Sequence, residues 1–599
     1  MIFIEMNEAA DHIAMKAAST MTHVIRQVPG VRYNSKDKTW DLPLSWASCV
    51  ISRGILGAEL QIGPTLSAWA FKEKERLLQL RQLRDNKELD DLGKELWHVG
   101  SDLELFPFQQ VGASFMARAG QALNADEMGL GKTVQTITAL KLLQAHGNEI
   151  FPVLIVAPNT IKRVWAREFE KWWPEMVNQI AIVSGGTVAG KMAVRKVLEG
   201  DAKILIMNYE MLPKLSRLEQ YGSIALLGCS SCDPNSLRPP RDCHREPKIL
   251  NEIPWHTVIA DEAHRLISPK ALWTRALWAT SKKARYRFAL TGTPIANHPG
   301  NLWGVMHFVS PDEYPRRSTW VNRYCLTVPN PYSGYVDIVG LKSETRSELD
   351  EYLLPRFLRR PKQAVLPDLP MKTYLQREVI LMGKQKKAYD QFRRELVAAV
   401  NDGTIFTTNP LTETLRLRQL ACSYAEALND GQGGMLMQEP SSKIDELMNI
   451  LEDLGGRQAV VFAEYSQLVK LAGARLEKAN IPFVYVMGGI KDTQIDRNVQ
   501  MFQNGERRVL LATLGSGSEG LTLTAADTAI FLQRSWQEIA NRQAEDRIHR
   551  IGQEAENVTI IDIIARDTVD EHMTKVLLGK RESMEIVCKD KETLLRWLT

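Results

Sequence analysis

The feature that most constrains this sequence is the recurrence of short, continuously apolar runs in two separate regions of the chain. In the first region these runs are residues 153–157, 180–183, 204–207, 258–260 and 288–290. In the second region they are residues 459–462, 483–486, 509–512, 529–532 and 558–564. Segments of helical period separate the runs, and strands that are apolar on both faces are typical of parallel sheets covered by helices on both sides. The sequence therefore predicts an α/β fold with two parallel-sheet lobes.

The length of 599 residues is too great for one hydrophobic core, so several domains are expected. Residues 28–44 read as two short strands joined by a polar turn, and residues 70–92 as a charged connecting helix. The predicted order is a small α+β N-terminal module with its connecting helix, a first lobe, a helical region with a linker, and a second lobe with C-terminal helices. Their predicted bounds are 1–95, 96–299, 300–440 and 441–599, with a polar insert at 213–254 in the first lobe.

Composition excludes some classes of protein and leaves others open. The formal charge is only +4, which is compatible with nucleic-acid binding but does not argue for it. No apolar run approaches the roughly 20 residues of a membrane helix, so no membrane partner is expected. Seven cysteines in a chain without a secretory signal favour a reducing compartment. We therefore expect an intracellular protein of the cytoplasm or nucleoid.

A phosphate-binding loop is predicted at residues 126–133, between an apolar segment and a helical one. Its residues are Asp126, Glu127, Met128, Gly129, Leu130, Gly131, Lys132 and Thr133. The two glycines let the backbone approach a triphosphate, Lys132 supplies a cation for the β/γ-phosphates, and Thr133 supplies a hydroxyl for Mg²⁺. The general pattern has glycine where this chain has Asp126. Without other support, a glycine-rich helix start would be a competing interpretation.

An acidic pair, Asp261 and Glu262, follows the apolar run at 258–260. A carboxylate at the end of such a strand can hold the Mg²⁺ of a nucleotide, and its neighbour can orient the attacking water. We assign Asp261 to the metal and Glu262 to the water. A surface acidic pair at a helix start is the alternative.

Three further groups of residues have weaker signals. Gln109 carries an amide that can pair with both edges of adenine, or it is an exposed glutamine at a helix start. The segment 290–294, Leu-Thr-Gly-Thr-Pro, either senses the phosphate state or forms a simple turn. DNA phosphates are the expected contacts of a group at strand ends, namely Lys162, Arg163 and Trp165 in the first lobe and Thr513 and Ser516 in the second, and for Lys162 and Arg163 a solvated helix face is the alternative.

Arg547 and Arg550 lie in a charged segment, residues 543–553, that is predicted to be helical. Residues three apart share a helical face, so both guanidinium groups can face a nucleotide and stabilise the charge of phosphoryl transfer. A solvated charged helix is the alternative.

The order of these motifs resembles that of superfamily-two helicases, and most of all the Snf-type ATPase motors of the Swi/Snf family. Asp-Glu-Met-Gly-Leu-Gly-Lys-Thr at 126–133 is similar to that branch's own form of the loop, so Asp126 fits the pattern. Arg-Ile-His-Arg-Ile-Gly-Gln at 547–553 and Phe-Leu-Arg-Arg-Pro-Lys at 357–362 are also similar to it. The resemblance covers roughly residues 100–570 and implies two RecA-like lobes that close on ATP and Mg²⁺ while moving along duplex DNA.

A narrower resemblance is to the annealing-helicase (HepA-related) subgroup. It rests on Gly520-Leu521-Thr522, on residues 543–547, and on residues 28–44, which resemble that subgroup's small N-terminal DNA-binding module. The resemblance also places Gly520 at the nucleotide. Relatives commonly have Trp-Asn-Pro where this chain has Trp-Gln-Glu at 536–538. That difference concerns local loop contacts and not the two arginines.

A candidate zinc site lies in the polar insert. Cys229 and Cys232 have the spacing of a zinc-binding turn, and Cys243 and His244 supply two further ligands. Cys243 and His244 are adjacent, which is awkward for two ligands of one ion, so Asp233, Asp242 or His256 could replace one of them. A flexible loop with free thiols is the alternative to a zinc site.

Taken together, the motifs predict a DNA-dependent ATPase that translocates on double-stranded or branched DNA without reading its sequence, with annealing or fork remodelling as its activity. The Asp-Glu-Ala-His tetrapeptide at 261–264 leaves a strand-separating DNA or RNA helicase as an alternative. The two remaining alternatives are a nucleotide-gated DNA-binding scaffold and a nucleosome remodeller.

Overall fold

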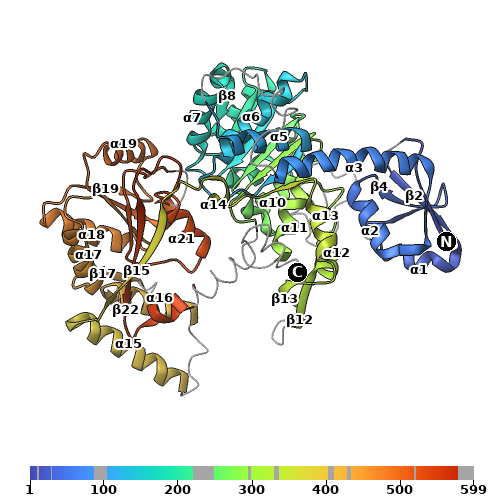
Figure 1. Cartoon of the computed structure of the whole chain (residues 1–599). Coiled ribbons are helices and arrows are strands. Elements are labelled where there is room, and N and C mark those ends of the chain that lie inside the picture. The colour runs from blue at the N-terminus through green and yellow to red at the C-terminus, as the bar shows by residue number, and fades with distance from the viewer. Residues whose placement is uncertain are drawn as a thin grey trace. The chain divides into compact units, whose positions relative to one another are not determined.

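A computed structural model describes most of the chain. The described residues are 1–9, 12–28, 30–85, 104–219, 248–294, 299–329, 336–401, 410–427, 434–517, 521–575 and 577. They form two compact units, the first holding most of residues 1–365 and the second most of residues 366–586 (Figure 1). Each unit contains one large parallel sheet. The α/β class, the two parallel-sheet lobes, the helical insertions and the small α+β N-terminal module are confirmed.

The sheet of the first unit has seven parallel strands in the order β14-β6-β11-β10-β7-β9-β8. Their bounds are β6 Gln121–Asn124, β7 Val153–Ala157, β8 Ile180–Ile182, β9 Ile204–Asn208, β10 Thr257–Asp261, β11 Tyr286–Leu290 and β14 Phe357–Leu358. Every residue of β7, β10 and β11 is buried, as the continuous apolar runs predict. The helices of this lobe are α5 Pro107–Ala119, α6 Lys132–Ala145, α7 Lys162–Trp172, α8 Thr187–Leu198, α9 Leu212–Leu215 and α10 Leu272–Ser281.

The N-terminal module is a five-stranded sheet in the order β3-β4-β2-β1-β5, with two short helices. Its elements are β1 Ile2–Met6, β2 His12–Ala17, α1 Thr22–Ile25, β3 Arg32–Asn34, β4 Thr39–Pro43, α2 Trp46–Leu56 and β5 Leu60–Ile62. The predicted pair of strands within 28–44 is confirmed, because β3 and β4 pair antiparallel with Arg32 opposite Asp41. Helix α3 (Pro64–Asp85) corresponds to the predicted connecting helix.

Helices and a hairpin lie between β11 and β14 along the chain. They are α11 Leu302–Val309, α12 Arg317–Tyr324, the hairpin of β12 Cys325–Pro329 and β13 Val336–Leu341, and α13 Arg346–Leu353. Buried aromatic residues of this region, among them Trp303, Tyr314 and Trp320, belong to the same hydrophobic cluster as Ile2 and Ile13 of the N-terminal module. The module therefore shares a core with the first unit.

The sheet of the second unit has six parallel strands in the order β15-β22-β21-β18-β20-β19. Their bounds are β15 Met371–Val379, β18 Ala459–Ala463, β19 Phe483–Val486, β20 Val509–Thr513, β21 Thr528–Phe531 and β22 Asn557–Ala565. The helices of this unit are α15 Gly383–Asn401, α16 Pro410–Cys422, α17 Ser442–Asp453, α18 Ser466–Lys478, α19 Asp492–Gln503, α20 Leu514–Gly517 and α21 Glu538–Glu545. A small hairpin, β16 Tyr424–Ala427 with β17 Met435–Gln438, follows α16. Strand β15 belongs to this sheet although it lies before residue 441.

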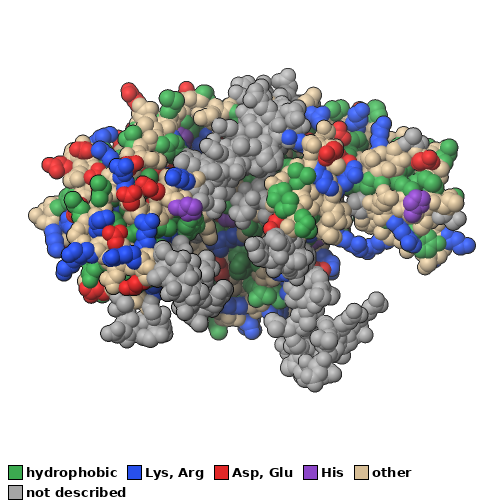
Figure 2. Space-filling view, turned by 90° about the horizontal axis from the view of Figure 1, so that it is seen from below, with side chains coloured by type: hydrophobic (Ala, Val, Ile, Leu, Met, Phe, Trp, Pro, Cys, Tyr) green, Lys and Arg blue, Asp and Glu red, His purple; other side chains and the backbone are tan. Residues whose placement is uncertain are grey.

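On the face drawn in Figure 2, basic and acidic side chains are interspersed over the described surface, as the small formal charge of +4 leads one to expect. No described helix is both long and apolar enough to cross a membrane.

Candidate nucleotide site

Three neighbouring strands of the first sheet end in register. Asn124 at the end of β6 lies opposite Leu290 at the end of β11, and Leu290 lies opposite Asp261 at the end of β10. The phosphate loop, the Thr291 turn and the acidic pair follow these three ends directly. Because all three strands run parallel, the three segments emerge side by side at the carboxyl edge of the sheet, where ligands bind in folds of this class.

The phosphate loop connects β6 to α6 through two glycines in left-handed conformations. Gly129 has φ +83° and Gly131 has φ +74°, values that favour glycine. A Cβ at Gly131 would lie 2.5 Å from the Nε2 of Gln109, so the position also lacks room for a side chain. Helix α6 then begins at Lys132, and its N-terminal amide groups form a ready site for an anion.

Lys132 and Thr133 occupy the first turn of α6, and both are half-buried. The Nζ of Lys132 donates to the backbone oxygens of Asp126 and Glu127, at 2.9 and 3.3 Å. The ammonium group is therefore folded over its own loop. Phosphate oxygens are the stronger acceptors, so the loop, the helix start and this lysine fit a triphosphate.

Asp126 is fully buried, and its carboxylate belongs to an internal network. Arg360 donates through Nε and Nη2 to the two carboxylate oxygens at 3.0 and 2.5 Å, and Gln135 Nε2 donates to Oδ2 at 3.1 Å. Asn124 donates to the Oε1 of Gln135 at 3.0 Å. The residue that departs from the general loop pattern thus anchors the base of the loop. A nucleotide contact of Asp126 stays a prediction.

The acidic pair lies at the end of β10. Asp261 is buried, and Glu262 adopts φ +50°, an uncommon value for a residue with a side chain, which costs on the order of 1–3 kcal/mol. The Glu262 N–H donates to the Oδ1 of Asp261 at 2.9 Å. His264 Nδ1 lies 3.2 Å from the Oε2 of Glu262 and 3.3 Å from the hydroxyl of Thr291. The segment 290–294 is thereby connected to the acidic pair, as a phosphate-sensing segment would be.

Two aromatic side chains fix Asp261. The indole N–H of Trp165, a fully buried residue of α7, donates to the Oδ2 of Asp261 at 2.8 Å. The hydroxyl of Tyr209 donates to the backbone oxygen of Asp261 at 2.7 Å. Sequence reasoning singled out neither contact, because Trp165 lies 96 residues from Asp261 and nothing local marks the pairing.

The electrostatics of the pair fit a divalent cation. Burial and the charge of Glu262 together raise the pKa of Asp261 to about 6, although the hydrogen bond from Trp165 and the charge of Lys132 act to lower it. The interaction with Lys132 places the phosphate loop and the acidic pair in one electrostatic environment. Two negatively charged carboxylates side by side at a buried position repel each other, and a bound cation offsets that repulsion. Carboxylate and hydroxyl oxygens are ligands that Mg²⁺ accepts.

Gln109 lies in the first turn of α5 and is buried, so the alternative of an exposed glutamine is wrong. Its Oε1 accepts from the backbone N–H of Phe106 at 3.2 Å, which caps the start of its own helix. Its Nε2 side faces the position of Gly131. The amide is thus next to the phosphate loop, and adenine recognition by it stays a prediction.

Both interpretations of Lys162, as a DNA contact and as part of a solvated helix face, are wrong. The residue is buried, and its Nζ donates to the backbone oxygen of Val183 at 2.6 Å. The ammonium group thus ties the start of α7 to the end of β8. The i,i+3/i+4 pattern around Lys162 does not reveal this, because the acceptor is a backbone atom 21 residues away.

In the second unit the predicted helix over 543–553 is only partly confirmed. Helix α21 ends at Glu545, and turns carry the chain from there to β22. Arg547 and Arg550 nevertheless remain together, since both Nη1 atoms donate to the backbone oxygen of Leu521 at 3.3 Å. That oxygen lies directly after Gly520, which is outside the described residues.

The candidate zinc ligands Cys229, Cys232, Cys243 and His244 also lie outside the described residues. Within the described part of the chain, no group of three or more His, Cys, Asp or Glu side chains is arranged around a common point that could hold a metal ion. The described cysteines Cys49, Cys325 and Cys422 are free thiols.

Comparison with protein-family models places this site in a known context. A model described as the SNF2-related domain matches residues 108–426, and one described as the helicase conserved C-terminal domain matches residues 442–552. The first match alone covers more than half of the chain. Arg360 and strand β15 both lie within the first match.

Curated relatives are similar over most of this chain. The SWI/SNF-related matrix-associated actin-dependent regulator of chromatin subfamily A-like protein 1 of Xenopus laevis is 25% identical, over 93% of this chain and 51% of its own length. The DNA annealing helicase and endonuclease ZRANB3 of Mus musculus is 27% identical, over 82% and 42%. The chain thus spans about half the length of the curated relatives it matches.

Among solved structures, the Sulfolobus solfataricus SWI2/SNF2 ATPase core in complex with dsDNA aligns with 83% of this chain and 95% of its own, at 24% identity and a TM-score of 0.37.

Proposed function

Since the chain belongs to the SNF2-related family, we propose that it is a DNA-dependent ATPase that translocates on double-stranded or branched DNA. The observation that carries the proposal is the alignment of Asn124, Leu290 and Asp261 at one edge of the first sheet. It brings the phosphate loop and the acidic pair together. ATP with Mg²⁺ supplies the phosphoryl group and the charge neutralisation for its transfer.

Each residue of the site has a proposed role. The loop amides and the Lys132 ammonium bind the phosphates, and Thr133 with Asp261 holds the cation. Glu262 orients the attacking water, and its contact with His264 keeps the carboxylate directed. Arg547 and Arg550 act as arginine fingers from the second unit, which makes hydrolysis dependent on both units.

DNA is the proposed partner, and two sets of facts support it. The relatives named above act on DNA or chromatin according to their names, and the N-terminal sheet corresponds to the segment that resembles a small DNA-binding module. We expect contacts with phosphates rather than base edges, so affinity is independent of sequence and falls with salt. Annealing or fork remodelling is the proposed use of the motor.

The Lys132→Ala variant tests the assignment. Removing the ammonium group leaves the phosphate charge without its main cation, so we expect hydrolysis to fall by more than about 100-fold while DNA affinity is unchanged. ATPase rates are measured on single-stranded, duplex and forked DNA and on RNA. Near wild-type turnover in the variant contradicts the assignment, and stimulation by RNA or single strands over duplex favours a strand-separating helicase instead.

The zinc site is proposed separately, on the Cys-x2-Cys spacing of Cys229 and Cys232 and the presence of Cys243 and His244. Metal analysis of the untreated protein should give one equivalent of zinc per chain. A zinc content below one equivalent contradicts the proposed zinc site. An intracellular location is likewise part of the proposal, and the free thiols of the described cysteines support it.

A further inference from the structure

The segment that links the two units is fixed at its first end to the phosphate loop. Backbone N–H groups of Leu123, Ala125 and Glu127 donate to the oxygens of residues 356, 358 and 360 at 2.6, 2.7 and 3.1 Å. This ladder continues the pairing of β14 with β6 into the first residues of the loop. The chain leaving the first unit therefore runs alongside the chain entering the nucleotide site.

Arg360 reinforces this anchor with its side chain. It is 6% exposed, forms two bonds to the carboxylate of Asp126, and donates to the Oε1 of Gln135 at 3.0 Å. It also donates to the backbone oxygen of Phe108 and lies over that ring at 5.5 Å. Directly after it, the N–H of Lys362 donates to the Oε2 of Glu127 at 2.7 Å. The anchor is thus a buried ion pair surrounded by hydrogen bonds.

The second end of the linking segment is fixed beside the arginine turn of the second unit. Lys372, at the start of β15, donates to Glu545 Oε2 at 3.4 Å and to Asp546 Oδ1 at 3.0 Å. The hydroxyl of Tyr374 donates to the same oxygen of Glu545 at 2.9 Å. Burial lowers the pKa of Lys372, but the charges of Asp546 and Glu545 outweigh it and raise the pKa above its usual value.

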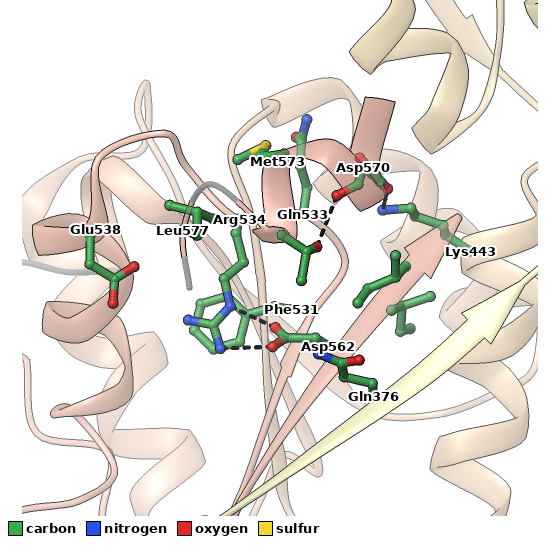
Figure 3. A pocket seen from close by; sticks show the side chains of 13 residues that line it. Gln376, Lys443, Phe531, Gln533, Arg534, Glu538, Asp562, Asp570, Met573 and Leu577 are labelled. Atoms are coloured by element: carbon green, nitrogen blue, oxygen red, sulfur yellow. Dashed lines mark hydrogen bonds and ion pairs between the residues drawn. The ribbon is translucent and has the colours of Figure 1, made fainter. Parts of the chain in front are cut away.

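Glu545 is the centre of this second anchor. It is fully buried at the end of α21, two residues before Arg547, and its Oε1 accepts from Arg534 at 2.7 Å. Arg534 also pairs with Asp562 of β22 at 2.6 Å and lies over the ring of Phe531 (Figure 3). Next to it, the Nε2 of His549, in the turn between the two arginines, lies 2.8 Å from the backbone oxygen of Pro370. The turn is therefore held against the linking segment on both sides of Arg547.

Between the anchors the linking segment is short and rich in proline. Arg360 and Lys372 are 12 positions apart (372 − 360) and enclose the short helix α14 (Lys362–Val365). Pro361, Pro367 and Pro370 fix three of the intervening φ angles and remove three N–H groups. A stiff connector transmits a displacement of one end to the other, whereas a flexible one absorbs it.

From these contacts we infer that the segment 360–372 mechanically couples the phosphate loop to the arginine turn, with Arg360 and Lys372 as positioning residues at its two ends. The inference rests on the proposed function, since it concerns residues to which that function gives a role in ATP hydrolysis. Nucleotide bound at the phosphate loop shifts the position of Arg360, and the segment passes this displacement to Lys372. The contacts of Lys372 with Glu545 and Asp546 then change the orientation of Arg547 and Arg550. Neither Arg360 nor Lys372 touches the nucleotide in this role.

The first test lengthens the linking segment while leaving both anchors intact. Four residues, Gly-Ser-Gly-Ser, are inserted between Leu366 and Pro367, and hydrogen exchange is followed with and without a non-hydrolysable ATP analogue. In the wild-type protein we expect the analogue to slow exchange at least 10-fold both in the loop, 129–134, and in the turn, 546–552. In the insertion variant we expect slowing in the loop only. Equal slowing of the turn in both proteins, or slowing in the wild-type loop alone or in neither segment, overturns the inference.

The second test removes one anchor. Lys372→Met should speed exchange of 546–552 at least 10-fold in the free protein and lower kcat without changing KM for ATP, and Lys372→Arg should restore both. Arg377→Met is the matched control, because Arg377 lies on the same strand and pairs with Asp453 at 3.0 Å but contacts no residue of the arginine turn. A Lys372→Met protein that lowers thermal stability as Arg377→Met does, with unchanged turn exchange, contradicts the positioning role.

Hydrogen exchange needs no turnover, so the two proposals fail in distinguishable ways. If DNA does not stimulate hydrolysis while the exchange pattern is as expected, the proposed dependence on DNA is wrong, whereas the nucleotide site and the coupling stand. If DNA stimulates hydrolysis equally in the wild-type and the insertion variant, the function stands and the coupling is wrong.

Discussion

The most informative single substitution is Trp165→Phe, because it isolates one hydrogen bond to the proposed metal ligand. Trp165 donates to the Oδ2 of Asp261 at 2.8 Å, and this bond lowers the pKa of the carboxyl group, which burial nevertheless keeps raised at about 6. Phenylalanine keeps an aromatic ring in the core and removes the donor. The substitution therefore disfavours the ionised form of Asp261, which is the form that binds a cation.

The size of the effect follows from the charge on the acceptor. A hydrogen bond to a charged group contributes about 1.5–3 kcal/mol, which corresponds to roughly one to two pKa units. The pKa of Asp261 should thus rise from about 6 to about 7–8 in the variant. Since a proton competes with Mg²⁺ for the carboxylate, the half-saturating concentration of free Mg²⁺ at pH 6.5 should rise roughly 3- to 25-fold over wild type. Near pH 9 both proteins are ionised, and this competition vanishes.

The assay is the DNA-stimulated ATPase rate as a function of free Mg²⁺ at several pH values between 6.5 and 9. Trp172→Phe is the matched control, since Trp172 lies on the same helix, is also buried, and donates to Glu168 at 3.1 Å instead. The control should lose stability through the smaller ring without a pH-dependent change in Mg²⁺ requirement. A Trp165→Phe defect that is independent of pH, or equal to that of Trp172→Phe, would refute the argument.

Two further predictions concern the phosphate loop and the buried Lys162. Gly131→Ala should weaken binding of an ATP analogue at least about 10-fold, because the new Cβ adds a clash with Gln109 to the strain of the left-handed backbone. Gly147→Ala is the control, since Gly147 has φ +73° but no atom of a non-adjacent described residue lies within 4 Å of an added Cβ, so only the backbone strain applies. Equal affinities of the two variants by titration would contradict the argument. Lys162→Met should lower the melting temperature, because the oxygen of Val183 loses its donor, yet leave the salt dependence of DNA affinity unchanged; a shallower slope would restore the DNA contact.

The strands were predictable because a parallel strand buried on both faces leaves a local signature. All ten apolar runs coincide with observed strands to within one or two residues at each end. Strands β14 and β15 lack that signature. The first has only two residues, and β15 is largely exposed along its length and contains no continuous apolar run. An edge strand buried on one side at most reads as a linker, and both strands lie within the region 300–440 that the sequence predicts to be helical with a linker.

The site was predictable to the extent that its chemistry is written in consecutive residues. The loop 126–133 and the pair Asp261–Glu262 follow strand ends, so the parallel topology alone brings them together. The supports of the site are different in kind. Arg360 lies 234 residues from Asp126, and Lys372 lies 173 residues from Glu545. Each is a single charged residue in a polar stretch, and only the fold reveals which carboxylate it meets.

Arg547 and Arg550 lie together as predicted, but the geometry that holds them together differs from the predicted helical face. A helical face explains why residues three apart would point the same way, but the helix ends at Glu545. Glu545 is fully buried and binds Lys372, Tyr374 and Arg534. The two guanidinium groups are then aligned by a shared acceptor, the oxygen of Leu521. A turn held by such contacts can change its aim when they change, whereas a continuous helix would hold both arginines rigidly, and this difference makes the arginine turn a suitable end point for the coupling segment.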